Sequence, residues 1–141
     1  MANYCCTIRT NYFHVKDENA FRTFMSRVYG CEDDIELWEE KDKDGRAVFG
    51  FGVYGGISGI RDQDADEDSS YDDFIDKLQE FVADDDAVII LESGNEKMRY
   101  VVGSATIVTS SDYKYIDIED IAVKQAGEML HNPLWKTICD Y

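Results

Sequence analysis

Few side chains in the sequence are suited to catalysis. The two histidines, His14 and His131, have no Ser, Cys or Asp neighbour in a known catalytic motif. The four cysteines form no Cys-x-x-Cys pair and have no His at zinc spacing. They are Cys5, Cys6, Cys31 and Cys139. We therefore expect packing roles for these residues, and we predict no catalytic residue, no metal site and no cofactor.

Carboxylates are the most abundant reactive groups in the sequence, and they are concentrated in two stretches. The chain has 30 acidic and 14 basic residues, a net charge of -16. Residues 61–86 hold 12 acids against 2 bases, and residues 32–44 hold 8 against 2. The rest of the chain is balanced, with 10 of each. The charge is therefore local, and a local field can be recognised by a partner.

The strongest cluster lies on and beside a predicted helix over residues 71–83. Asp72, Asp76 and Glu80 are spaced four apart, which places one carboxylate about every 6 Å along a helix. Duplex DNA presents one phosphate per about 3.4 Å on each strand, so this row can imitate a phosphate track. The predicted partner-binding residues are Asp62, Asp64, Asp66, Asp68, Asp72, Asp73, Asp76, Glu80, Asp84, Asp85 and Asp86.

The alternating aspartates at 62–68 also resemble the first three ligand positions of an EF-hand calcium loop. The pattern then departs from the loop. Glu67 occupies the position that needs Gly, and Asp73 rather than Glu occupies the twelfth position. We therefore predict no specific calcium site at this segment.

In size, charge and clustering along 32–44 and 61–86, the chain resembles the small acidic inhibitors of mobile elements. These are the antirestriction and anti-CRISPR proteins that mimic nucleic acid. The resemblance implies a non-catalytic inhibitor that binds a basic, nucleic-acid-binding site of a partner protein, such as a nuclease, and binds no nucleic acid directly.

Three other functions are compatible with the sequence. The first is an immunity protein that neutralises a basic toxin. The second is a small ligand-binding or enzymatic domain with a pocket near the glycine-rich strand 46–54. The third is a homodimer joined through the apolar tail 134–141, which otherwise covers the core of its own chain.

Composition indicates a folded protein away from membranes. With 141 residues, of which 44% are hydrophobic, we predict one domain over 1–141. No apolar run approaches the roughly 18 residues of a membrane span, and the N-terminus lacks a signal-peptide pattern. We predict a cytoplasmic protein with no membrane partner, either a monomer or a homodimer.

Hydrophobic periodicity predicts an α+β fold. Apolar stripes at helical spacing predict helices over 18–29, 71–83 and 118–130. Alternating or wholly apolar runs predict strands, and Asp44-Gly45 predicts a hairpin turn. The order helix, acidic corner, strand, turn, strand occurs at 18–54 and again at 71–108. We therefore predict a mainly antiparallel sheet built from two helix-hairpin units, with three helices mostly on one face.

Overall fold

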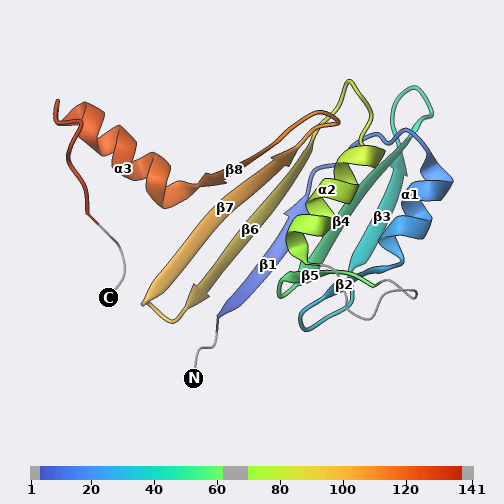
Figure 1. Ribbon diagram of the computed structural model, residues 1–141, viewed down its shortest axis with the longest axis horizontal. Coiled ribbons are helices and arrows are strands. Elements are labelled where there is room, and N and C mark those ends of the chain that lie inside the picture. Colours follow the sequence, from blue (N-terminus) through green and yellow to red (C-terminus); the bar gives the residue numbers. More distant parts are fainter. Residues whose placement is uncertain (1–3, 62–69, 138–141) are drawn as a thin grey trace.

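Eight strands and three helices form the part of the chain that the computed structural model describes, residues 4–61 and 70–137 (Figure 1). The strands are β1 (Cys5–Thr10), β2 (Val28–Gly30), β3 (Glu36–Lys41), β4 (Ala47–Tyr54), β5 (Ile57–Ile60), β6 (Val88–Glu96), β7 (Tyr100–Val108) and β8 (Tyr113–Asp117). The helices are α1 (Glu18–Met25), α2 (Tyr71–Phe81) and α3 (Ile118–Met129).

Six of the strands form one antiparallel sheet in the order β3-β4-β1-β6-β7-β8. Strand β1 lies inside it and pairs with β4 on one side and β6 on the other. The predicted hairpin is confirmed, because β3 and β4 pair around a turn in which Gly45 adopts a φ of 82°. Strands β2 and β5 pair with each other in a separate two-stranded sheet.

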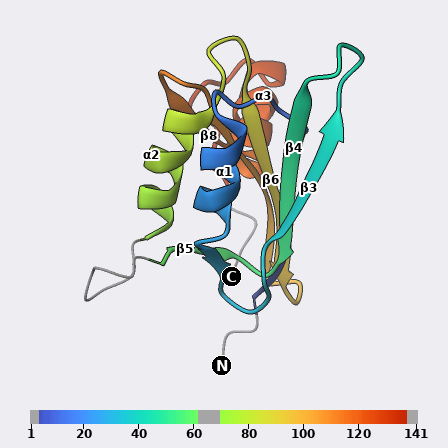
Figure 2. The same ribbon diagram turned by 90° about the vertical axis from the view of Figure 1, so that its right-hand side faces the viewer.

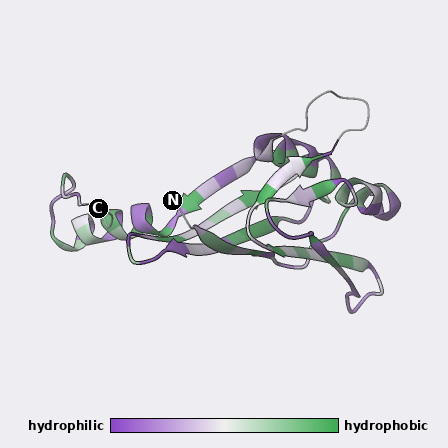
Figure 3. Ribbon diagram, turned by 90° about the horizontal axis from the view of Figure 1, so that it is seen from below, coloured by the Kyte–Doolittle hydropathy of each residue, from purple (hydrophilic) through white to green (hydrophobic). Residues whose placement is uncertain are grey.

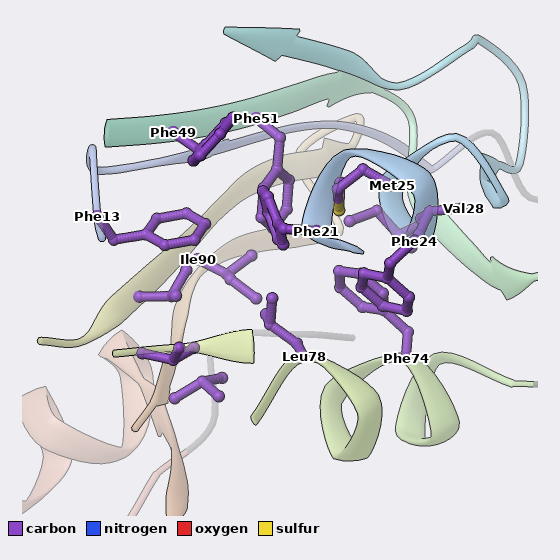
Figure 4. Close-up of a cluster of buried hydrophobic side chains, with 14 of the residues drawn as sticks. Phe13, Phe21, Phe24, Met25, Val28, Phe49, Phe51, Phe74, Leu78 and Ile90 are labelled. Atoms are coloured by element: carbon purple, nitrogen blue, oxygen red, sulfur yellow. The ribbon is translucent and has the colours of Figure 1, made fainter. Parts of the chain in front are cut away.

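Helices α1 and α2 cover one face of this sheet (Figure 2). Each begins at a capping residue, Asp17 for α1 and Ser70 for α2, whose side chain accepts a hydrogen bond from the first turn. Their apolar stripes meet the sheet in an aromatic core (Figure 4). The rings of Phe24 and Phe74 stack across the two helices, with centroids 5.9 Å apart. The buried side chains include Phe13, Phe21, Phe49, Phe51, Leu78 and Ile90.

Helix α3 is placed differently. It begins at Ile118, directly after the last residue of β8, and projects from the end of the molecule opposite α1 (Figure 1). Gly127 is the buried position in this helix. None of the three helices in the described ranges is long and apolar enough to cross a bilayer.

The predicted architecture of two helix-hairpin units with three helices on one face is wrong. Strand β1 separates the two hairpins, β8 extends one edge of the sheet, and β2 and β5 form a second sheet. Residues 55–60 carry too few alternating side chains to predict a strand. The apolar stripe of α3 matches those of α1 and α2 in spacing, so periodicity could not show that it lies apart from them.

Candidate functional site

The acidic residues predicted to bind a partner do not act as one free surface. Asp62, Asp64, Asp66 and Asp68 lie outside the described residues. On α2, the outer face carries Asp72, Asp76 and Glu80, all exposed. The ammonium group of Lys77 lies 3.3 Å from the Glu80 carboxylate. The regular row of charges is therefore interrupted by a cation one helical turn before its end.

Asp73 has a role in the helix itself. Its carboxylate accepts a hydrogen bond from the backbone N–H of Ser70 at 2.9 Å, and the Ser70 hydroxyl in turn accepts from the Asp73 N–H at 3.4 Å. This reciprocal pair is a capping box, which satisfies donors that the first turn leaves unpaired. Asp73 therefore serves helix formation.

The three aspartates that follow α2, Asp84, Asp85 and Asp86, have different surroundings. Asp84 lies 3.3 Å from the ammonium group of Lys16. Hydrogen bonds from Ser110 and Lys16 lower the pKa of the Asp84 carboxyl. Asp85 is exposed, and Asp86 is half-buried against the segment that follows β1.

At that corner a histidine bridges two aspartates from distant parts of the chain. The Nδ1 atom of His14 lies 2.8 Å from the Asp86 carboxylate, and its Nε2 atom lies 2.7 Å from the Asp42 carboxylate. The His14 backbone N–H also donates to Asp86, at 2.8 Å. These contacts, called here the histidine clamp, join the β3–β4 turn, the segment after β1 and the α2–β6 corner.

The histidine clamp has the electrostatics of an imidazolium between two carboxylates. Hydrogen bonds to Asp42 and Asp86 raise the pKa of His14 above its ordinary value. The hydrogen bond from His14 lowers the pKa of Asp42. Burial pushes the pKa of Asp86 up, but hydrogen bonds from His14 and from the Ala87 N–H outweigh it, so that pKa is lowered. Each ring nitrogen lies within hydrogen-bond distance of a carboxylate oxygen, so neither is open to a substrate that a general base could deprotonate.

The cysteines of β1 line a polar groove beside Glu32 and Tyr54. Burial, together with the nearby Glu92, raises the pKa of the Cys6 thiol to about 11. At neutral pH the thiol is therefore protonated, and a protonated thiol is a poor nucleophile and metal ligand. In the described part of the chain, no three His, Cys, Asp or Glu side chains gather as a metal site.

A second candidate surface is apolar and lies on strands β6, β7 and β8. Pairing places Leu91 of β6 opposite Ala105 of β7, and Ala105 opposite Ile116 of β8. Residues directly opposite in a sheet share a face, so these side chains form a continuous row. The row continues into Ile118 and Ile121 at the start of α3, which line the same groove.

Large apolar side chains on and around this row are exposed to solvent. Leu91 is 56% exposed, Ile118 is 62% exposed and Ile121 is 45% exposed. Further along α3 and the segment after it, Met129 is 79% exposed and Leu134 is 90% exposed. The surface, called here the C-terminal apolar face, consists of Leu91, Val101, Gly103, Ala105, Ile116, Ile118, Ile121, Met129, Leu130 and Leu134.

Two grooves run through this face. One, of about 350 Å³, has a floor that includes Gly103 and Ala105. The other, of about 460 Å³, lies between Val101, α3 and Trp135. Ile118 lines both. A Cβ atom at Gly103 would lie 3.1 Å from Ile118 Cγ2, so the absence of a side chain there lets the base of α3 sit against β7.

The apolar stripe of α3 is exposed to solvent, and Ile118 and Ile121 at its start also line the groove on the sheet. Its half-buried positions are Glu119, Val123 and Ala126, whereas Ile118, Ile121 and Met129 are exposed. Figure 3 shows this helix at the far end of the sheet, with hydrophobic positions along it. On α2 the arrangement is the usual one, with apolar residues buried and carboxylates outward.

Sequence reasoning singled out one part of this face, the apolar tail from Leu134, as a dimer contact or a cover for the core, and missed the rest, although two signals were present. The run Val88–Leu91 is apolar at every position, so both faces of β6 carry apolar side chains. The tail beginning at Leu134 is apolar as well. Neither signal indicates which partner, within the chain or outside it, covers the second face.

Comparisons with known proteins give one structural likeness. No protein-family model matches the chain, and no curated protein sequence matches it. A solved structure that is similar is LarC2, the C-terminal domain of a cyclometallase involved in the synthesis of the NPN cofactor of lactate racemase, in its apo form. The likeness covers 94% of this chain and 90% of that chain, with a TM-score of 0.32 and 13% sequence identity. Similarity at this level carries no argument about fold or activity.

The prediction of an acidic inhibitor that acts by charge mimicry is wrong. In the structure, Asp84 and Asp86 are engaged by Lys16 and His14, and Asp73 caps a helix. The immunity-protein alternative depends on the same acidic surface and is withdrawn with it.

Proposed function

We propose that this chain is a protein-docking domain whose C-terminal apolar face covers a complementary apolar surface of another protein. The observation that carries the proposal is the exposed apolar stripe of α3, with Ile118, Ile121 and Met129 each at least 45% exposed. Contiguous exposed apolar surface of this kind is rare on proteins that act alone and marks interaction sites.

Energetics support a covered face. Fully burying a side chain such as Leu, Ile or Met stabilises a complex by about 1.5–3 kcal/mol relative to leaving it exposed. In addition, an isolated helix shorter than about 12–15 residues is marginal in water, and most helical stability in proteins comes from packing. Helix α3 has 12 residues and little packing of its own. A partner that buries Ile121 and Met129 would supply what the helix lacks.

The shape of the face favours a protein over a small molecule. Sites for small ligands usually enclose 70–90% or more of the ligand surface. The grooves on either side of Ile118 are open along their length, and their exposed lining residues leave a bound molecule facing water. A helix or a sheet face of another protein would cover both grooves together.

The charge distribution also favours an apolar partner. Residues 1–87 hold 22 acids and 9 bases, a net charge of -13. Residues 88–141 hold 8 acids and 5 bases, a net charge of -3. The docking face therefore lies in the part of the chain with little net field, where desolvation of charge costs least.

Two side chains with reactive groups, His14 and Cys6, are poorly suited to catalysis. The imidazole of His14 is occupied on both nitrogens, and the Cys6 thiol is protonated at neutral pH. We assign the function to the face and not to a reacting group.

Photocrosslinking tests the proposal. A photoreactive residue placed at Ile121, and separately at Met129, is expected to give the same protein adduct on irradiation in the cell. Adding Leu91→Asp to either variant should abolish that adduct. Leu37 on β3 is a matched control, because it is 37% exposed and pairs with Phe51 on the other face of the sheet. The absence of an adduct from Ile121 and Met129, or an identical adduct from Leu37, would contradict the proposal.

A further inference from the structure

We infer that the histidine clamp is a pH-dependent switch, which holds the β3–β4 turn against the protein while His14 is protonated and releases the turn when His14 is neutral. The turn consists of residues 42–46, between β3 and β4. The switch is separate from the proposed docking function, because the docking face lies on β6, β7, β8 and α3.

The ring of His14 contacts two carboxylates, each through a different nitrogen. Its Nδ1 atom lies 2.8 Å from Asp86 Oδ2, and its Nε2 atom lies 2.7 Å from Asp42 Oδ2. A protonated imidazole has an N–H on both nitrogens and can donate to both carboxylates, whereas a neutral imidazole has one N–H and one lone pair. When the ring loses a proton to water, one carboxylate therefore faces a lone pair at hydrogen-bond distance, and that contact is repulsive.

The Asp86 side of the clamp is fixed by backbone hydrogen bonds. Asp86 Oδ2 also accepts from the His14 backbone N–H at 2.8 Å, and Asp86 Oδ1 accepts from the Ala87 N–H at 2.8 Å. The His14 carbonyl accepts from the Ala83 N–H at 3.1 Å. His14 and Asp86 therefore cannot separate without loss of hydrogen bonds that do not depend on the protonation of the ring.

The Asp42 side of the clamp is able to move. Asp42 belongs to a turn that begins at the edge strand β3 and projects beyond the sheet (Figure 2). Its Oδ1 atom accepts from the N–H groups of Asp44 and Arg46, at 2.9 Å each. Because these bonds lie within the turn, the turn keeps its shape when it moves. The neutral ring is therefore expected to keep its proton on Nδ1 and to release Asp42.

The charges around the ring set the pH at which the switch operates. The two carboxylates of the clamp favour the imidazolium, whereas Arg46 in the turn and partial burial oppose it. Lys16 and Asp84, on the neighbouring segments, form an ion pair with each other. The carboxylates dominate and raise the pKa of His14, so release occurs above its ordinary value of about 6.5.

NMR spectroscopy of the full chain, labelled with ¹⁵N, tests the switch. The imidazole ¹⁵N shifts report the protonation and tautomer of His14 from about pH 6 to 10, and backbone order parameters report the motion of residues 42–46. The order parameters of the turn are expected to fall from about 0.85 to below about 0.6 as the ring deprotonates. Val53 of β4, which pairs with β1, should stay rigid and so show that the sheet is intact.

Asp42→Asn separates the switch from a general effect of pH on the turn. The amide oxygen can still accept from the Asp44 and Arg46 N–H groups, and the amide N–H can donate to the lone pair on Nε2. This variant is expected to keep the turn ordered at the pH where the original protein releases it. Asp44→Asn is a matched control, because it removes one charge from an exposed position of the same turn. It should retain the loss of order.

Four results would overturn the inference. The first is a turn that stays ordered on both sides of the His14 titration, and the second is a ring that stays protonated wherever the protein is folded. The third is a neutral ring with its proton on Nε2, since Asp86 would then be the carboxylate that faces the lone pair. The fourth is the same loss of order in Asp42→Asn as in Asp44→Asn. Photocrosslinking from Ile121 and Met129 tests the docking function separately.

Discussion

Helices α2 and α3 present the same kind of sequence in opposite surroundings. Each has an N-terminal cap, acidic residues in its first turn and an apolar stripe at helical spacing. The stripe of α2 lies in the aromatic core, where Phe74 and Leu78 are fully buried. The stripe of α3 is exposed from Ile118 to Met129. An amphipathic pattern therefore shows that a helix has a face to cover, and the rest of the molecule decides what covers it.

The two regions also use charge differently. Around α1 and α2, ionic contacts hold separate segments together, as in the histidine clamp and in the bidentate pair of Arg22 with Glu39, at 2.9 Å for each bond. Around α3, apolar side chains meet solvent and the net charge is small. The first region is complete within one chain, whereas we propose that the second is completed by a partner. Four predictions test this contrast.

Truncation of matched apolar residues should give the largest difference. Leu78→Ala empties part of the aromatic core and should lower the free energy of unfolding by about 2–5 kcal/mol. Ile121→Ala should change it by no more than about 0.5 kcal/mol in dilute protein, since surface substitutions usually stay in that range. Urea unfolding followed by circular dichroism measures both. Equal losses would show that α3 is packed as tightly as α2.

The histidine clamp should make the acidic region sensitive to pH. The pKa of His14 is raised in the folded state, so its contribution to stability is complete below about pH 6.5, the unfolded value, and is lost as pH rises through the folded pKa. Asp42 and Asp86 have lowered pKa values, so their contributions are lost as pH falls below about 3.8.

Urea midpoints of the original protein and of His14→Gln measure this effect. The difference between the two should be greatest at about pH 5–6 and should shrink above neutrality. His131→Gln serves as a control, because His131 lies after α3 and takes no part in the clamp. A difference that stays constant with pH would show that the imidazole is neutral in the folded protein.

Removing the N-terminal caps of α2 and α3 should change the free energy of unfolding by unequal but smaller amounts. Ser70→Ala removes the capping box of α2 and should cost about 1 kcal/mol of global stability. Asp117 caps α3 by accepting a hydrogen bond from the Glu119 N–H at 2.8 Å. In dilute protein, Asp117→Ala should cost less than Ser70→Ala, because α3 contributes little packing to the core. Thermal unfolding of the two variants compares them, and a larger cost at Asp117 would reverse the contrast.

The smallest effect on stability is expected at Met129. Met129→Gln replaces a side chain that is 79% exposed and should leave the free energy of unfolding unchanged within about 0.5 kcal/mol. The same variant should nevertheless associate more weakly, because the substituted side chain lies in the proposed contact. Hydrogen exchange of α3 amides, compared with and without the crosslinked partner, gives an independent measurement. Loss of stability without loss of association would contradict the docking face.

Several features of the fold could be predicted because their causes are local. The caps of α1 and α2, the hairpin at Gly45 and the buried stripe of α2 follow from side chains that interact within a few residues of each other. The histidine clamp could not be predicted in this way. His14 is 28 residues from Asp42 and 72 residues from Asp86 along the chain, and no periodicity connects them.

The prediction of an acidic inhibitor was wrong for a related reason. The density of carboxylates at 61–86 is visible in the sequence, but the ion pairs that engage Asp84 and Asp86 depend on Lys16 and His14, which are distant along the chain. The exposure of Leu91 and Ile118 likewise depends on which strands surround them. Composition describes how much charge and apolar surface exist, and tertiary contacts determine how much of each remains available.

The amino-acid sequence by itself determined the amphipathic helices, the capped ends, the hairpin and the large excess of acid, because each depends on neighbouring residues or on simple counting. Only the tertiary structure decided the central position of β1, the separate β2–β5 sheet and the outward stripe of α3. These depend on which segments meet across the chain, since the same apolar pattern can bury itself against its own sheet or against another molecule.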